Sequence, residues 1–110
     1  MQTTFTARRF RARPEIKAHA LEAVQKLDKF YDSIVKANIV LSFEGAAKNI
    51  KVVEINLHVH GVLLFAKEKS EDFRKSTDLV IEKLSKQLTK YKTKLRMKDK
   101  MKVRVMKEKV

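Results

Sequence analysis

Hydrophobic positions recur along this chain with two different periods, which divide it into six predicted elements. Apolar residues spaced three and four apart indicate a helix with one buried face, whereas strict alternation indicates a half-exposed strand. Short segments rich in Thr, Val, Ile and Phe also favour strands. The predicted strands cover residues 2–10, 37–45, 50–60 and 62–69, and the predicted helices cover residues 14–31 and 71–96.

The predicted helices have local start signals of unequal strength. Pro14 suits the first turn of a helix, although Arg13 before it is a poor N-cap. In the second helix we expect Glu71 and Asp72 in the first turn, where carboxylates favour the helix dipole. The predicted buried stripes comprise Ile16, Ala20, Ala23, Leu27 and Phe30, with Val24 and Tyr31 at the edge, in the first helix, and Phe73, Thr77, Val80, Leu84, Leu88, Tyr91 and Leu95 in the second.

The order of these elements, β-α-β-β-β-α, predicts an α+β fold. His60-Gly61 lies between two strands and is a predicted hairpin turn. A four-stranded, mostly antiparallel sheet with two helices packed on one face buries both helical stripes and one sheet face. The highly charged segment 97–110 lacks a helical stripe. We therefore predict one domain, residues 1–96, followed by a basic, flexible C-terminal tail, residues 97–110.

Positive charge is concentrated near the end of the chain. The formal net charge over 110 residues is +13, and residues 83–110 contain 12 Lys and Arg against two acids. This bias predicts a polyanionic partner, either a nucleic acid or an anionic membrane. Cysteine is absent, which excludes disulfides and thiolate metal sites. The start lacks the apolar core of a signal peptide, and the longest hydrophobic run, residues 62–66, is too short to span a bilayer, so we expect a cytoplasmic protein.

Catalytic and metal-binding patterns are sparse in this sequence. Glycine occurs only at positions 45 and 61, so no phosphate-cradling loop motif is present. No Ser, His and acid occur in the context of an activated nucleophile. His58 and His60 share a predicted strand face with Glu54, but further ligands are not evident, and His19 lies on the first helix. We therefore predict a protein that is not an enzyme and has no metal and no cofactor.

The second predicted helix has a narrow stripe of polar and basic residues. On a helical wheel with about 100° per residue, this stripe lies within roughly 60° of Lys83 and flanks the leucines. Its members are Lys83, Lys86, Gln87, Lys90 and Lys94. The first helix has Lys26 and Lys29 beside its own apolar stripe, and we expect it to be the neighbour of the lysines. The two helices would then form a basic ridge or groove matched to phosphates.

Three partners compete for the basic stripe. A coiled coil needs complementary acids, which are too few here. A membrane-surface helix exposes a broad apolar face, which this helix needs for the core. Exposed aromatic residues are few, so stacking of single-stranded bases is not favoured. Phosphate contact with structured RNA, recognised by shape, fits the pattern better.

Three separated segments resemble bacterial ribosome hibernation-promoting factors and ribosome-associated inhibitors. The segment "SEDFRKSTDLVIEKLSKQLTKYKTKL", residues 70–95, resembles the signature helix of that family. "KLDKFYDSIVKANIVLSFE" resembles the end of its first helix and its second strand, and "INLHVHGVLLFAKEKSED" resembles its central hairpin. The resemblance covers about residues 3–96 in matching order and spacing.

This resemblance implies a fold related to double-stranded-RNA-binding domains and a specific partner. It implies binding to the small ribosomal subunit and its rRNA, in the channel for mRNA and the A- and P-site tRNAs. Translation would be inhibited and idle ribosomes preserved under stress or in stationary phase; another hibernation factor is a candidate partner, and DNA and membrane are not expected. The implied RNA-binding residues are Arg8, Lys26, Lys29, Lys83, Lys86, Gln87, Lys90 and Lys94.

The chain departs from the family pattern near its first helix. Ala7 replaces a frequent glycine, and Arg13 replaces a Thr or Ser cap, so Arg9, Arg11 and Arg13 are further candidates for phosphate contact. We expect no second, dimerising domain like that of long family members, so the chain resembles the short forms. The alternative interpretation is a general structured-RNA-binding module without preference for the ribosome.

Overall fold

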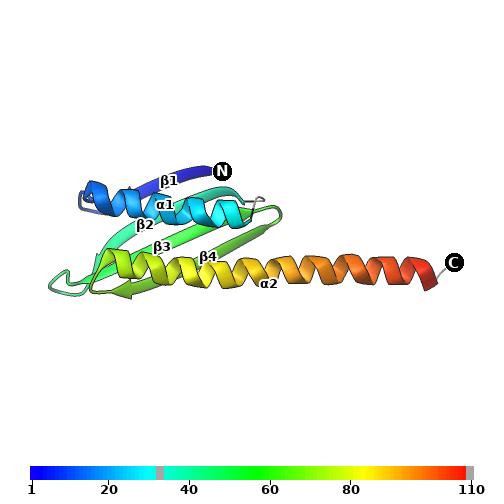
Figure 1. Cartoon of the computed structure of the whole chain (residues 1–110). Coiled ribbons are helices and arrows are strands. Elements are labelled where there is room, and N and C mark those ends of the chain that lie inside the picture. Colours follow the sequence, from blue (N-terminus) through cyan, green and yellow to red (C-terminus); the bar gives the residue numbers. More distant parts are fainter. Residues whose placement is uncertain (32–33, 109–110) are drawn as a thin grey trace.

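Six elements follow one another in the predicted order. The computed structural model describes the backbone of residues 1–31 and 34–108, and the side chains of residues 1–29, 31 and 34–92. The elements are β1 (Gln2–Ala7), α1 (Pro14–Phe30), β2 (Ile34–Glu44), β3 (Ile50–Val59), β4 (Val62–Ser70) and α2 (Phe73–Glu108). Figure 1 shows both helices on the same side of the sheet, which confirms the predicted α+β architecture.

The four strands form one sheet in the order β1-β2-β3-β4. The β1–β2 pair is parallel and the other two pairs are antiparallel. A parallel pair needs a crossover connection, and α1 supplies it. Gly61 turns the β3–β4 hairpin with a φ of 76°, a conformation that glycine adopts without steric cost. The predicted mostly antiparallel sheet is therefore confirmed.

The hydrophobic core lies between the helices and one face of the sheet. Ile39 of β2 pairs with Ile55 of β3, which pairs with Ala66 of β4, and all three side chains are buried. The opposite face is uncovered, because both helices lie on the same side (Figure 1). The helices contribute buried side chains from the predicted stripes, namely Ala20, Ala23, Val24, Leu27, Phe73, Thr77, Val80, Leu84 and Leu88. The predicted core residues Phe30 and Leu95 lie outside the described side chains.

The start of α1 is held by backbone and aromatic contacts. Arg13 is the N-cap but makes no side-chain capping bond, as predicted, and Pro14 occupies the first turn. The loop before α1 is anchored by Phe10, whose ring stacks on Phe73 of α2 at a centroid distance of 5.4 Å. Phe10 also contacts Phe43 of β2 edge to face at 4.7 Å. This aromatic cluster ties the β1–α1 loop to the sheet and to the beginning of α2.

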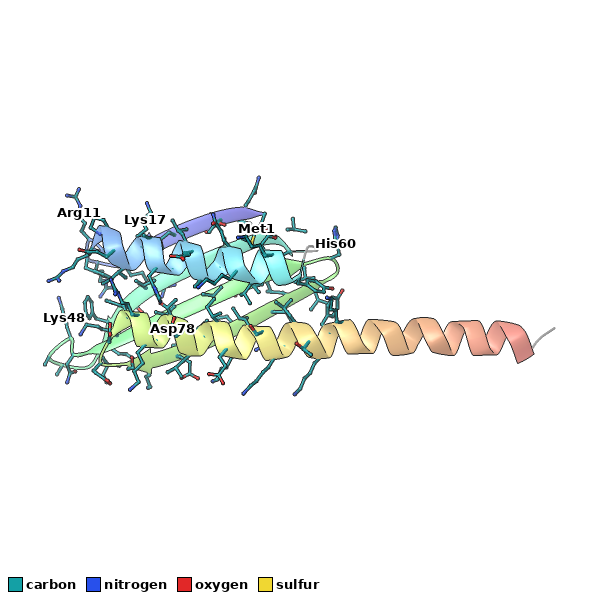
Figure 2. The ribbon with its side chains drawn as sticks, viewed as in Figure 1. Met1, Arg11, Lys17, Lys48, His60 and Asp78 are labelled. Atoms are coloured by element: carbon teal, nitrogen blue, oxygen red, sulfur yellow. The ribbon has the colours of Figure 1, made fainter. Side chains whose placement is uncertain are left out.

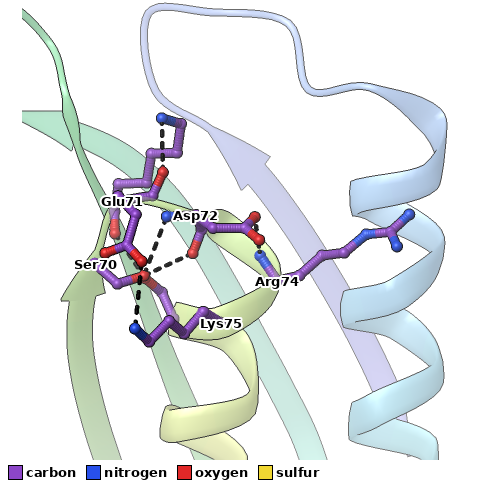
Figure 3. Close-up of polar contacts among 7 residues, drawn as sticks. Ser70, Glu71, Asp72, Arg74 and Lys75 are labelled. Carbon is purple, nitrogen blue, oxygen red and sulfur yellow. Dashed lines mark hydrogen bonds and ion pairs between the residues drawn. The ribbon is translucent and has the colours of Figure 1, made fainter.

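The beginning of α2 differs from the prediction in its first turn. Glu71 and Asp72 precede the helix, which begins at Phe73. Asp72 accepts a hydrogen bond from the backbone N–H of Arg74 through Oδ1 at 3.0 Å, as an N-capping carboxylate does (Figure 3). The Ser70 hydroxyl donates to the Asp72 carbonyl oxygen at 2.7 Å. The side chains of Ser70 and Asp72 thus satisfy backbone hydrogen-bonding groups of the turn. Glu71 and Asp72 therefore lie before the first residue of the helix.

The end of α2 also differs from the prediction. The helix continues to Glu108, whereas we expected it to end at residue 96. Residues 93–108 contain neither Gly nor Pro and are rich in Lys, Arg and Met, which are strong helix formers. The helical stripe ends there, but no stop signal accompanies its end. As Figure 1 shows, α2 projects well beyond the sheet.

Truncation of a core side chain on α2 should destabilise the fold strongly. Leu84 is fully buried, so Leu84→Ala should lower the free energy of unfolding by about 2–5 kcal/mol. The control, Leu63→Ala on the uncovered face, should change it by less than about 0.5 kcal/mol, because that side chain is 59% exposed. Urea denaturation measures both. Equal losses would contradict the assignment of the core to the helix-covered face.

The turn before α2 also predicts a specific titration. The hydrogen bond from its own backbone N–H, together with the hydrogen bond and charge of Lys75, holds the pKa of Glu71 below its ordinary value. Lys75→Gln should therefore raise this pKa, whereas Lys69→Gln should leave it unchanged. Because the folded pKa is lowered, the stabilisation is present above the unfolded pKa and is lost as pH falls through the folded pKa. Carboxyl NMR titration measures the shift; an unchanged pKa in Lys75→Gln would refute the contribution of Lys75.

Candidate nucleic-acid interface

The basic stripe of α2 lies along the edge of β4 and away from α1. Lys83 forms an ion pair with Glu68 of β4. Gln87 donates a hydrogen bond from Nε2 to the backbone carbonyl of Phe65, also on β4, at 3.0 Å. The prediction that helix 1 neighbours this stripe is therefore wrong. A helical wheel gives the angle between the lysines and the leucines, but it does not reveal which neighbour each flank meets.

The opposite flank of α2 faces α1 across a shallow groove. His19 of α1 and Asp78 of α2 bridge the helices, with Nε2 and Oδ1 2.8 Å apart. Lys26 and Glu22 line the same groove, together with Ile81. Two carboxylates and one lysine give this groove mixed charge. The predicted basic groove between the helices is therefore not formed here.

Three of the remaining predicted RNA-binding residues on the helices, Lys29, Lys86 and Lys90, are solvent-facing. Lys29 lies in the last turn of α1 and is exposed. Lys86 and Lys90 are exposed on α2, and Lys86 pairs with Glu82 one turn earlier at 3.5 Å. An exposed pair of this kind contributes at most about 0.5 kcal/mol, so a phosphate can displace it cheaply. The side chain of Lys94 lies outside the described residues.

Arg8 belongs to a separate basic site at the far end of the sheet. It lines a concavity of about 530 Å³ together with Arg9, Lys48 and Lys67. Glu54 and Glu44 also line it, and each forms an ion pair with a lysine of β4, at 3.4 Å in both cases. Arg9 and Lys48 adopt positive φ angles of 63° and 53°. Figure 2 places Lys48 and Arg11 at this end of the sheet and His60 at the opposite end of the sheet.

The uncovered sheet face contains residues that the sequence analysis did not assign to a site. Phe65 is 48% exposed and Leu63 is 59% exposed, both on β4. The run "VLLFA" predicts a simple strand, and its alternation places Leu64 and Ala66 toward the core. The same alternation puts Leu63 and Phe65 outside. The signal for their exposure was the position of this strand at the edge of the sheet, where a helix covers only one of its two faces.

The predicted histidine pair is not held on one strand face. His58 lies on β3, where its Nε2 is 3.4 Å from Asn38 Nδ2, whereas His60 lies in the turn after the strand. Glu54 is engaged by Lys67. Within the described part of the chain, no three His, Cys, Asp or Glu side chains gather closely enough to hold a metal ion. None of the helices described is both long and apolar enough to cross a membrane.

The chain matches a known family model over most of its length. The model described as sigma 54 modulation protein / S30EA ribosomal protein matches residues 3–96. A ribosome hibernation promoting factor from Klebsiella oxytoca is 33% identical over 96 residues, which is 87% of this chain and 98% of that protein. A ribosome hibernation promotion factor from Lactococcus lactis is 31% identical over 83 residues, covering 76% of this chain but 45% of that longer protein.

Solved structures have the same fold. A ribosomal subunit interface protein from Coxiella burnetii superimposes with a TM-score of 0.77 at 26% identity, covering 84% of this chain and 99% of that chain. The N-terminal domain of Thermus thermophilus Protein Y gives a TM-score of 0.72 at 22% identity, covering 83% of this chain and 99% of that domain. The second comparison concerns the fold alone.

The contact between Gln87 and β4 predicts a structural role for this side chain. Gln87→Ala removes the amide that caps the Phe65 carbonyl, so it should lower the free energy of unfolding by about 1 kcal/mol. The control Lys90→Ala, on the exposed side of α2, should change it by less than about 0.5 kcal/mol. Chemical denaturation compares the two variants. An unchanged stability in Gln87→Ala would show that this bond makes no net contribution.

Proposed function

The chain belongs to the sigma 54 modulation protein / S30EA ribosomal protein family, and from this premise we propose that it is a ribosome hibernation factor that occupies the small subunit. It would bind ribosomal RNA in the channel for mRNA and the A- and P-site tRNAs. Translation would stop because mRNA and tRNA are excluded by occupancy, without catalysis or a cofactor. Idle ribosomes would thereby be preserved under stress or in stationary phase.

The family match over residues 3–96 carries this proposal. The charge distribution supports it, because a net charge of +13 favours a partner rich in phosphates. The exposed lysines of α2 would contact the rRNA backbone from a helix that is packed on the sheet and capped at its start. Lys26 and Lys29 of α1 and Arg8 would add contacts from other sides of the domain. Gln87 would support Lys83 and Lys90 by fixing α2 to the β4 edge.

The extended end of α2 is a further part of this proposal. Residues 1–96 would act as the ribosome-binding domain, and the basic segment 97–110 would follow the RNA path beyond it. The structure continues α2 through residue 108, so this segment would present its charges from a helix when bound. The protein would be cytoplasmic and ribosome-associated, with another hibernation factor as a candidate partner.

Charge reversal on α2 tests whether position or total charge governs ribosome binding. Lys86→Glu with Lys90→Glu should weaken co-sedimentation with small subunits at least tenfold, because each reversal removes a phosphate contact and adds repulsion. Lys107→Glu with Lys109→Glu makes the same change in net charge in the final segment, and it should weaken binding much less. Thermal unfolding of both double variants checks that the fold is intact. Equal losses would refute a special role for the α2 lysines.

Competition separates ribosome occupancy from general RNA binding. The proposal requires that tRNA bound to small subunits reduce association of the protein, and that the affinity fall steeply with salt. If a duplex RNA of arbitrary sequence binds as tightly as small subunits, and tRNA does not compete, the alternative of a general structured-RNA-binding module is favoured. Failure to co-sediment with intact ribosomes at low salt would refute the proposal.

A further inference from the structure

The uncovered sheet face exposes an aromatic ring at the edge strand. Phe65 is 48% exposed, and its neighbour along the same face of β4, Leu63, is 59% exposed. Across the sheet, Phe65 is directly opposite Asn56, and Leu63 is opposite His58. His58 is therefore a diagonal neighbour of Phe65, at a spacing of about 7–8 Å that aromatic side chains can span. An aromatic and an imidazole ring thus lie together on a solvent-facing surface.

The row of residues beside Phe65 provides hydrogen-bonding groups. Asn56 on β3 pairs with Asn38 on β2, and Asn38 pairs with Thr4 on β1, so a polar row runs across the whole sheet. The Thr4 hydroxyl donates to Asn38 Oδ1 at 2.6 Å, which orients that amide. Within the described residues, no hydrogen bond uses the Asn56 side chain. This amide can therefore pair with the edge of a ligand stacked on Phe65.

The basic concavity continues this surface along β4. Lys67 follows Phe65 on the same face, about 7 Å along the strand, and lines the concavity with Arg8, Arg9 and Lys48. The two carboxylates there are paired with lysines of β4. The ion pairs of the described residues use none of Arg8, Arg9 and Lys48. These three cations are therefore available to an anion.

The backbone at two of these cations adopts an uncommon conformation. Arg9 and Lys48 adopt left-handed φ angles of 63° and 53°, which non-glycine residues seldom do. Such conformations persist where the surroundings enforce them, and they cluster at ligand sites. The neighbouring Phe10 packs against Phe43 and so anchors the loop that contains Arg9. The backbone N–H of Arg8 also donates to the Leu41 carbonyl at 2.9 Å.

We propose that the uncovered sheet face is a binding site for an unpaired RNA strand, with a base stacked on Phe65 and backbone phosphates held by Arg8, Arg9 and Lys48. Stacking on a sheet aromatic is sequence-tolerant, because every base has a π-face. Asn56 contacts the edge of the stacked base. RNA fits better than a protein partner because the aromatic ring and three cations without a carboxylate partner lie on one open face, about 20 Å apart by the strand register, a distance that a few nucleotides of an extended strand can cross.

This site is distinct from the one that the proposed function uses on the helices. It lies on the opposite face of the sheet and requires no ribosome for its detection. Arg8 is the residue common to both, so it is left unchanged in the variants below. An rRNA-bound protein could therefore hold a second, unpaired strand on its outer face.

Fluorescence anisotropy with a labelled oligouridine and the full-length protein tests the stacking contact. Phe65→Ala and Phe65→Leu should weaken binding about 5- to 100-fold, because both remove the aromatic face. Phe65→Tyr keeps that face and should bind like the unchanged protein. Co-sedimentation of Phe65→Ala with small subunits should stay unchanged, which separates this site from the proposed function. Thermal unfolding verifies that each variant is folded.

The salt dependence of the same assay tests the phosphate contacts. Arg9→Asn with Lys48→Asn removes two cations with a residue that tolerates positive φ. The slope of log affinity against log salt should become shallower by about 1.4, because each single-strand phosphate contact contributes about 0.7. Lys17→Gln with Lys75→Gln makes an equal change in net charge on the helix side, and its slope should stay close to that of the unchanged protein.

Several results would overturn the proposal. Unchanged affinity in Phe65→Ala, or equal binding by Phe65→Leu and Phe65→Tyr, would mean that the surface is apolar but does not stack bases. Equal slopes in the two double variants would mean that bulk charge, and not the concavity, attracts the strand. Binding of inorganic pyrophosphate that displaces no oligouridine would reduce the site to an anion pocket.

Discussion

Burial of one sheet face under both helices is the constraint on which the other features of this protein depend. The paired row of Ile39, Ile55 and Ala66 sits at the centre of that face. Helices and sheet each have one apolar side, so packing them together uses up the hydrophobic surface of both. Most side chains that point the other way stay in contact with solvent, and Val52, buried at the concavity, is an exception. The two candidate RNA surfaces, along α2 and on the open sheet face, are the two outer sides of this single core.

The edge of β4 is the place where these two surfaces meet. An unpaired edge strand invites pairing with another chain, and proteins protect it with charge or with covering elements. Here the Gln87 amide donates a hydrogen bond to the Phe65 carbonyl. The Tyr91 hydroxyl donates to the His60 carbonyl at 2.8 Å, in the turn before β4. Charged lysines alternate with Glu68 along the strand. The contacts that fix α2 therefore also occupy part of this edge, and Lys83 lies beside the strand, paired with Glu68.

Hydrophobic periodicity predicted the elements well, because each of the two periods is typical of one kind of secondary structure with one buried face. The order of elements, the single covered face and most of the core stripe were read in this way. The neighbour of the basic stripe was not, because the side on which α1 lies depends on the crossover and on contacts such as His19 with Asp78. The end of α2 was missed because the apolar stripe fades while helix-forming residues continue. The predicted position of Glu71 and Asp72 in the first turn was wrong, because hydrogen bonds of Ser70 and Asp72 to groups two residues along the chain cap the helix at Phe73.

The exposed aromatic ring was missed for a related reason. A run such as "VLLFA" looks uniformly apolar, and its outward half becomes visible when the strand is known to be covered on one side only. The cations also differ in how available they are to a phosphate. Lys67, Lys69, Lys83 and Lys86 each form an ion pair with a carboxylate, which a phosphate must first displace.

The cations of the β1–α1 loop and the β2–β3 loop face no such competition. Arg9 and Lys48 have no carboxylate partner among the described residues, so a phosphate that binds them displaces no ion pair. Contacts at this end of the sheet should therefore contribute more affinity per charge than the paired lysines of β4, although the larger number of charges lies on α2.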